Sequence, residues 1–167
     1  ILNKFKIQNS KLQNDDHLEL VVLATIADMV PLLNANRTLT KYGLEKLRET
    51  KRAGLLELFR EAGLDAAIIG VYEVGHLIAP RLNAAGRLTH AMDSLRLLCT
   101  KDKGRAFELA QKLGVTNRER QQLTEETTSH AKLAISNTST SLSASEQLAI
   151  SKLIFISHES YQQGVIG

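Results

Sequence analysis

Residues 103–135 read KGRAFELAQKLGVTNRERQQLTEETTSHAKLAI, and this stretch decides the architecture. It contains no proline, and its helix-favouring composition predicts one continuous helix. One apolar stripe recurs there at helical spacing and consists of Ala106, Leu109, Ala110 and Leu113. A helix of this length with a polar middle usually bridges two bodies, so we expect a connecting helix between two domains.

Shorter helices are predicted on the N-terminal side of this stretch. Helical spacing of apolar residues predicts helices over 15–30, 35–48, 54–61 and 91–99, with Pro31 and Gly63 as stop signals. Residues 66–74 fit a strand or a helix by periodicity, and their short connection to Pro80 favours a helix. We expect Pro80 to begin a helical turn. The predicted inward residues of the first two helices are Leu18, Val22, Leu23, Ile26, Met29 and Val30, then Leu39, Tyr42, Leu44 and Leu47.

The composition is that of a globular protein with an aliphatic, helix-rich core. The chain has 167 residues, of which 43% are hydrophobic and 4% aromatic, and tryptophan is absent. The single cysteine, Cys99, is expected to be a buried, reduced thiol that forms no disulfide. No apolar run is long enough for a transmembrane helix and no signal peptide is evident, so we expect a cytoplasmic protein with no membrane contact.

The C-terminal part is expected to start a second domain. The segment NTSTSLSASE, 137–146, is too rich in serine and threonine to bury much apolar area, so 137–150 is predicted as a linker. Residues 152–157, KLIFIS, have the composition of a buried strand. The domains expected are therefore 1–102, the connecting helix 103–136, the linker and a new domain from 151 to 167. Because the chain lacks an initial Met and ends inside an apolar run, both ends are expected to be cuts through a larger protein.

Basic residues concentrate in the middle of the chain. Residues 81–120 carry nine Lys or Arg against four Asp or Glu, whereas residues 1–80 carry ten against ten and 121–167 carry two against four. This bias is compatible with a phosphate-bearing partner and also with a solvated helix face.

Asp28 lies among apolar residues in LATIADMVPL, 23–32. A carboxylate there is costly to bury, and the C-terminal end of a helix dipole also opposes it. A compensating cation is therefore expected. Two interpretations remain open: a salt bridge or simple exposure, or a ligand of Mg²⁺ or Mn²⁺, which prefer carboxylate oxygens.

The segment APRLNAAGRL, 79–88, could form a phosphate-binding wall. Asn83 and Arg87 are four residues apart and share one helix face, whereas Leu82, Ala85 and Gly86 are expected to face the packing side. Arg81 projects elsewhere, and the small residues permit close approach of a backbone. The alternative is an ordinary amphipathic turn with surface arginines.

A second polar cluster lies in the middle of the long helix and contains Asn117, Arg118, Arg120 and Gln121. It is either a solvated face or a guide for a nucleic-acid backbone. The five histidines lack the spacing of a metal site, and no Walker loop, G-x-S-x-G elbow or G-x-G-x-x-G fingerprint occurs.

Five segments, in this order and at these separations, resemble the RecJ branch of the DHH phosphoesterase superfamily. They are DHLELVVLATIADMVPL (16–32), NANRTLTKYGL (34–44), APRLNAAGRL (79–88), NRERQ (117–121) and HESYQQGVIG (158–167). The resemblance implies an α/β parent fold, of which this chain is a predominantly α-helical fragment with a strand that begins a second α/β domain. The family usually has Trp where Tyr161 stands and Phe where His76 stands.

The resemblance also implies roles for individual residues. Asp28 would be the last acidic ligand of a centre with two divalent metal ions, Mn²⁺ or Mg²⁺, whose other ligands precede Ile1. Arg81, Asn83 and Arg87 would line the active cleft and contact phosphates, with Asn117, Arg118 and Arg120 as further DNA contacts. The long helix would join the catalytic domain to a domain that grips single-stranded DNA.

The implied activity is metal-assisted hydrolysis of single-stranded DNA from the 5′ end, in DNA repair and recombination, by a monomer; the fragment alone would be inactive. Two alternatives remain. One is a phosphodiesterase of the same superfamily that acts on oligonucleotides or cyclic dinucleotides, and the other is a replication scaffold that has lost its metal site.

Overall fold

The computed structural model describes residues 17–88, 91–141 and 156–166. Helices account for most of these residues, and no β-strand occurs among them, which confirms the predominantly helical character predicted from the sequence. In chain order the elements are α1 (Leu18–Ala27), α2 (Asn34–Arg48), α3 (Ala53–Glu61), η2 (Ala66–Ile68), η3 (Glu73–Ile78), α4 (Ala79–Leu88), α5 (Met92–Cys99), α6 (Lys103–Ser141) and α8 (Gln163–Ile166).

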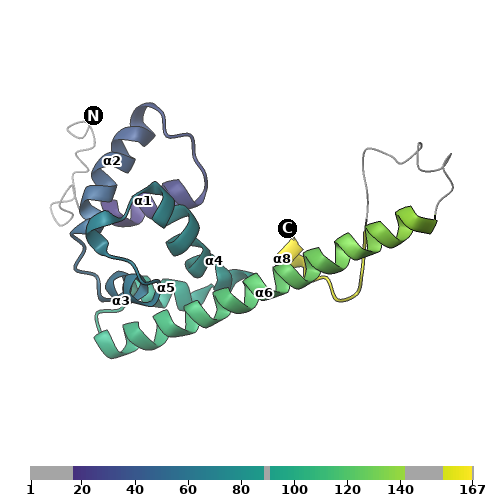
Figure 1. Ribbon diagram of the computed structural model, residues 1–167. Coiled ribbons are helices and arrows are strands. Elements are labelled where there is room, and N and C mark those ends of the chain that lie inside the picture. The colour runs from purple at the N-terminus through teal and green to yellow at the C-terminus, as the bar shows by residue number, and fades with distance from the viewer. Residues whose placement is uncertain (1–16, 89–90, 142–155, 167) are drawn as a thin grey trace.

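The long helix α6 organises the molecule. Helices α3, α4 and α5 all pack on its first half, and α1 and α2 pair with each other on the far side of that group (Figure 1). The second half of α6 extends away from this body, and residues 156–166 run back beside it, ending in α8 against α4 and α6. The continuous long helix predicted from the sequence is therefore confirmed, and its role as a connection between two domains stays a prediction.

The C-terminal predictions meet the described residues only in part. Helix α6 continues to Ser141, five residues into the segment predicted as a linker, and the rest of that linker lies outside the described residues. Most of the predicted strand 152–157 also lies outside them, and the two residues that are described, Ile156 and Ser157, have no regular secondary structure.

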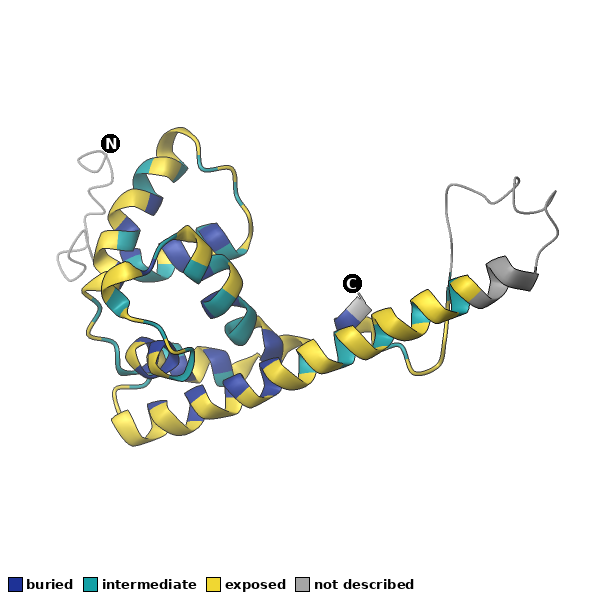
Figure 2. Cartoon of the chain, viewed as in Figure 1, coloured by how far each residue is buried: buried dark blue, intermediate teal, exposed yellow. Residues whose placement is uncertain are grey.

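The core is aliphatic and lies between α6 and the short helices. Leu55, Leu58 and Leu97 are fully buried there, and the first half of α6 buries one face, whereas the second half is mostly exposed (Figure 2). Two residues predicted to face inward do not: Met29 is 88% exposed and Tyr42 is 42% exposed. Met29 follows the end of α1 and has a positive φ, which turns it away from the helix stripe.

Pro80 does not begin a helix, contrary to the prediction. It is the second residue of α4, which continues directly from the π-helix η3. A proline inside a helix lacks one N–H donor and crowds the carbonyl four residues earlier, and the wider turn of a π-helix can accommodate both effects. The segment 66–74, predicted as one helix, is correspondingly divided into the short turn η2 and the start of η3.

Cys99 is exposed, so the prediction of a buried thiol was wrong. Helix α5 buries Ser94 and Leu97, and a residue two positions after Leu97 points to the opposite side of the helix.

None of the helices in the described part of the chain has an apolar stretch of the length needed to span a lipid bilayer.

Helices α3 and α5 touch through a glycine. A Cβ atom added to Gly54 would overlap the backbone carbonyl oxygen of Leu97. We therefore expect Gly54→Ala to lower the free energy of unfolding by about 1–3 kcal/mol, the usual cost of overpacking. Urea denaturation at unchanged m-value measures this loss. Gly104→Ala is the control, because its Cβ would make only an ordinary contact at 3.4 Å, and an equal loss in that variant would contradict the explanation.

Candidate phosphate-binding site

Helix α4 carries the segment APRLNAAGRL and presents its polar residues to solvent. Ala84 and Ala85 are buried against the rest of the body, whereas Asn83 and Arg87 are exposed and lie one turn apart, as expected. Gly86 is exposed, so the packing side is formed by Ala84 and Ala85 and not, as predicted, by Gly86. The small alanines bring α4 close to its neighbours and leave the Asn83–Arg87 face open.

Asp28 is exposed at the C-terminal end of α1. The compensating cation that we expected is not found, since no Lys, Arg or His of the described residues pairs with it. Asp28 lines a cavity of about 340 Å³ together with Asn83, and the remaining lining is mainly aliphatic. Tertiary structure thus brings the residues at positions 28 and 83 to one cavity, although 55 positions separate them in the sequence.

Arg87 connects α4 to the returning C-terminal segment. Its Nη1 donates a hydrogen bond of 3.0 Å to the carbonyl oxygen of Gly164. A Cβ atom at Gly164 would overlap the carbonyl oxygen of Arg87, so this contact between backbones requires a glycine. The hydrogen bond and the close backbone contact between Arg87 and Gly164 hold the start of α8 against the end of α4.

The parts of α4 and α6 that carry Arg87 and Arg120 lie together, because Leu88 lines one cavity with Glu119 and Gln122. The like charges of the two arginines repel. Burial lowers the pKa of the Arg120 guanidinium below its ordinary value, and the charge of Arg87 lowers it further. Arg120 donates two hydrogen bonds, of 3.3 and 3.4 Å, to Oδ1 of the buried Asn117, which is a neutral acceptor. Neither arginine forms an ion pair with a carboxylate of the described residues.

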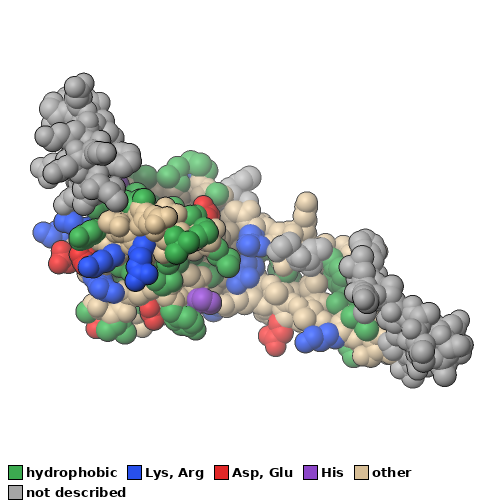
Figure 3. All heavy atoms as spheres, turned by 90° about the horizontal axis from the view of Figure 1, so that it is seen from above, with side chains coloured by type: hydrophobic (Ala, Val, Ile, Leu, Met, Phe, Trp, Pro, Cys, Tyr) green, Lys and Arg blue, Asp and Glu red, His purple; other side chains and the backbone are tan. Residues whose placement is uncertain are grey.

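Two basic residues nearby differ from this pair because they share an acidic partner. Lys112 and Arg96 bind Asp93, and hydrogen bonding by Lys112, followed by the Arg96 interaction, lowers the pKa of that carboxyl although burial opposes the change. Two neighbouring guanidinium groups without an acidic partner are suited to bind an anion with forked donors, such as a phosphate. Figure 3 shows basic side chains on the helical body and beside the point where α6 leaves it.

Arg81 has different surroundings from Arg87. Its Nε is 2.6 Å from Oε2 of Glu61, its Nη1 donates to the Leu77 carbonyl oxygen, and its side chain is only 16% exposed. Arg118 binds the other oxygen of Glu61 at 2.8 Å. The arginines predicted to contact phosphate therefore fall into two groups, Arg87 and Arg120 without a carboxylate and Arg81 and Arg118 around Glu61.

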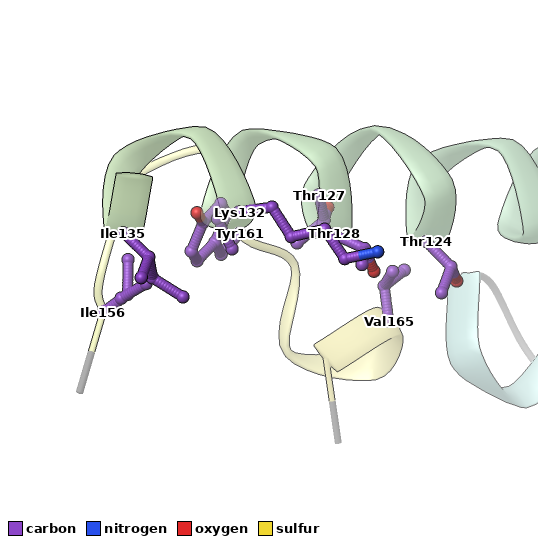
Figure 4. Close-up of a pocket in the computed structure, with 9 residues that line it drawn as sticks. Thr124, Thr127, Thr128, Lys132, Ile135, Ile156, Tyr161 and Val165 are labelled. Carbon is purple, nitrogen blue, oxygen red and sulfur yellow. The ribbon is translucent and has the colours of Figure 1, made fainter. Parts of the chain in front are cut away.

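A groove of about 550 Å³ lies between the second half of α6 and residues 156–165. It is lined by threonine side chains and Lys132 of α6, by Tyr161 of the returning segment and by aliphatic side chains of both, which include Ile135, Ile156 and Val165 (Figure 4). Nearby, the rings of His130, His158 and Tyr161 form a cluster with centroids 4.7–5.7 Å apart, and Nδ1 of His130 is 2.8 Å from the Tyr161 hydroxyl. The sequence did not predict this cluster, because its members are separated by a long segment without any spacing signal.

The described residues contain no group of three or more His, Cys, Asp or Glu side chains arranged to hold a metal ion. Asp28 alone does not make a metal site, and its role as one ligand stays a prediction. Of the remaining predicted residues, Asn83 shares its cavity, and Asn117 is buried as the acceptor for Arg120.

Known proteins share both the sequence and the fold of this chain. The single-stranded-DNA-specific exonuclease RecJ of Bacillus subtilis is 42% identical over 117 residues, which are 70% of this chain and 15% of that protein. RecJ of Salmonella typhimurium is 34% identical over 151 residues, 90% of this chain and 25% of that protein. A crystal structure of exonuclease RecJ bound to manganese matches 72% of this chain and 31% of its own chain, with 36% identity and a TM-score of 0.65.

The chain is a RecJ-type sequence. A crystal structure of RecJ from Thermus thermophilus in complex with Mg²⁺ agrees, with 38% identity and a TM-score of 0.63 over 68% of this chain and 18% of that one. No protein-family model matches the chain. The RecJ-type chain spans 15–25% of the length of the Bacillus and Salmonella relatives. The assignments of individual residues to metal or DNA remain predictions.

The guanidinium groups of Arg87 and Arg120, which form no ion pair with a described carboxylate, should together bind inorganic phosphate. We expect phosphate at about ten times its dissociation constant to raise the thermal midpoint by about 3–6 °C, since a ligand that binds only the folded state stabilises it. Arg87→Gln and Arg120→Gln should each lose most of this increase. The control is Arg105→Gln, because Arg105 is an exposed arginine at the start of α6. An increase in the thermal midpoint that survives in both site variants would contradict the anion site.

Proposed function

We propose that the protein containing this RecJ-type chain is a metal-dependent exonuclease that hydrolyses single-stranded DNA from the 5′ end. The chain would supply the phosphate-facing wall of its cleft. The observation that carries this proposal is that Arg87 and Arg120 lie where α4, α6 and α8 meet and that neither forms an ion pair with a carboxylate of the described residues. A polyanion supplies the negative charge that such a pair lacks.

Asp28 fits the role of one ligand of a divalent metal ion. It is an exposed carboxylate that pairs with no described cation, and it opens to the same cavity as the Asn83 amide. Mg²⁺ and Mn²⁺ prefer such oxygen donors. A centre of two ions needs further ligands from outside the described residues. When bound, the ions would activate water and offset charge on the phosphate oxygens.

The other residues of the wall would bind and orient the substrate. Arg87 and Arg120 would hold a backbone phosphate, Arg120 being kept in place by Asn117 and Arg87 by the Gly164 carbonyl group. Asn83, one turn before Arg87 on the exposed face of α4, would present its amide toward the neighbouring phosphate. Such positioning lowers the barrier to hydrolysis because the orientation is set before the reaction.

The remaining functional assignments follow the same proposal. Residues 1–102 would complete a catalytic domain, 103–136 would connect it through the linker 137–150 to a DNA-binding domain that begins near 151, and the protein would be a cytoplasmic monomer acting in DNA repair and recombination. The groove beside α6 contains threonine hydroxyls, Lys132 and Tyr161. These groups support the proposal that single-stranded DNA runs along α6. Backbone phosphates would contact the polar groups, and a base could pack on the ring.

Comparison of substrates tests the activity. The full-length protein should degrade a long 5′-phosphorylated single strand faster than a dinucleotide, because a long strand can occupy both the arginine pair and the groove. Release of acid-soluble nucleotide in Mn²⁺ measures both rates, with duplex DNA as the control. A preference for the dinucleotide would favour the oligonucleotide phosphodiesterase, and no hydrolysis of any of these substrates would favour the scaffold.

Asp28→Asn tests the metal assignment. The amide keeps the size of the side chain but loses the charge that holds a hard cation, so we expect cleavage in Mn²⁺ to fall by at least about a hundredfold while DNA binding without metal stays within about twofold. Asp65→Asn is a control of equal charge change at an exposed position whose side chain caps η2. Normal Mn²⁺-dependent turnover of Asp28→Asn would refute the ligand role.

A further inference from the structure

Glu61, the last residue of α3, lies at the centre of the ion pairs that connect three helices. Its carboxylate binds Nε of Arg81 on α4 at 2.6 Å and Nη1 of Arg118 on α6 at 2.8 Å, and its side chain is only 3% exposed. A carboxylate at the C-terminal end of a helix is disfavoured by the helix dipole. Its retention in a buried place therefore depends on the two guanidinium groups.

The long helix is shaped to receive this carboxylate. A Cβ atom at Gly114 of α6 would overlap both carboxylate oxygens of Glu61. Gly114 precedes Arg118 by one helical turn, so the gap and the guanidinium group are on neighbouring parts of one face. Glu61 thus fits into α6 at one point and binds α4 at another, which sets the distance between these two helices.

These two helices carry the two arginines of the candidate phosphate site. Arg87 is on α4, six residues after Arg81, and Arg120 is on α6, two residues after Arg118. The residues beside them, Leu88 on α4 and Gln122 on α6, line one cavity, so the two helices lie close together at this point. Like charges repel, so other contacts must hold the helices there. Glu61 offers such a contact, since it binds one arginine of each helix, Arg81 of α4 and Arg118 of α6.

We propose that Glu61 is a positioning residue that holds α4 and α6 at the spacing at which Arg87 and Arg120 bind one phosphate together. This role rests on the function proposed above. Glu61 does not touch the substrate itself. The sequence around Glu61, EAGLD (61–65), contains no motif that would predict this role.

Glu61→Gln tests the role in the full-length protein. A glutamine of the same size offers one carbonyl acceptor, but its NH₂ group would face the donor of the second arginine, so one of the two contacts must break. We expect the Kd for a fluorescent 5′-phosphorylated oligothymidine, measured without divalent metal, to rise about three- to thirtyfold. The KM for this strand should rise likewise, while kcat in Mn²⁺ stays within about twofold.

The sign of the change separates positioning from simple electrostatics. Removing a negative charge near DNA should by itself tighten binding, whereas loss of positioning weakens it. Glu57→Gln is the matched control: it lies one turn earlier on α3, is 11% exposed and pairs with the exposed Arg60 of the same helix. Its Kd should remain unchanged or fall slightly.

A second variant covers the case in which Glu61→Gln does not fold, as judged by circular dichroism. Gly114→Ala keeps Glu61 and should weaken binding, because its Cβ displaces the carboxylate, whereas Gly104→Ala at the start of α6 should bind like the wild type. A folded Gly114→Ala that binds as tightly as Gly104→Ala, or a folded Glu61→Gln that binds as tightly as Glu57→Gln, would overturn the positioning role alone. A wild-type protein that does not bind the oligothymidine would overturn the proposed function as well.

Discussion

The close contact of α6 with α3, α4 and α5 is the constraint on which the rest of the structure depends. Ala106, Ala110 and Gly114 recur every four residues along α6 and are buried, so a ridge of small residues faces the body. Short side chains let helix axes approach, and the aliphatic residues around them then lose their contact with water. The polar second half of α6 has no such ridge, and it extends beyond the body.

This packing also decides which charged groups form ion pairs. Where α6 meets the end of α3, Glu61 binds one arginine from each of two helices, and where α6 meets α5, Asp93 binds Lys112. Farther along α4 and α6, neither Arg87 nor Arg120 forms an ion pair with a carboxylate in the described part of the chain. A folded protein rarely brings two like charges together unless other contacts maintain them, and such an arrangement is characteristic of sites that bind an opposite charge.

The N-terminal part of the candidate site depends on the ends of helices. Helix α1 stops at Ala27, and the turn that follows leaves Asp28 at the surface with Met29 in a left-handed conformation. The sequence indicated that a carboxylate in this apolar segment was unusual, and it predicted a compensating cation. The early end of the helix removes the need for one, because solvent reaches the carboxylate at a cavity shared with Asn83.

Hydrophobic periodicity and composition by themselves determined the helices before residue 62, the long helix α6 and the shared face of Asn83 and Arg87, because these depend on neighbours within a few turns. Only the tertiary structure decided that Arg81 binds Glu61, that Arg87 lies near Arg120, and that Cys99 and Tyr42 are exposed. The direction in which a helix face points depends on which helix packs against it. The contacts of Glu61 join positions 20 and 57 residues away, and no local pattern specifies pairings at such separations.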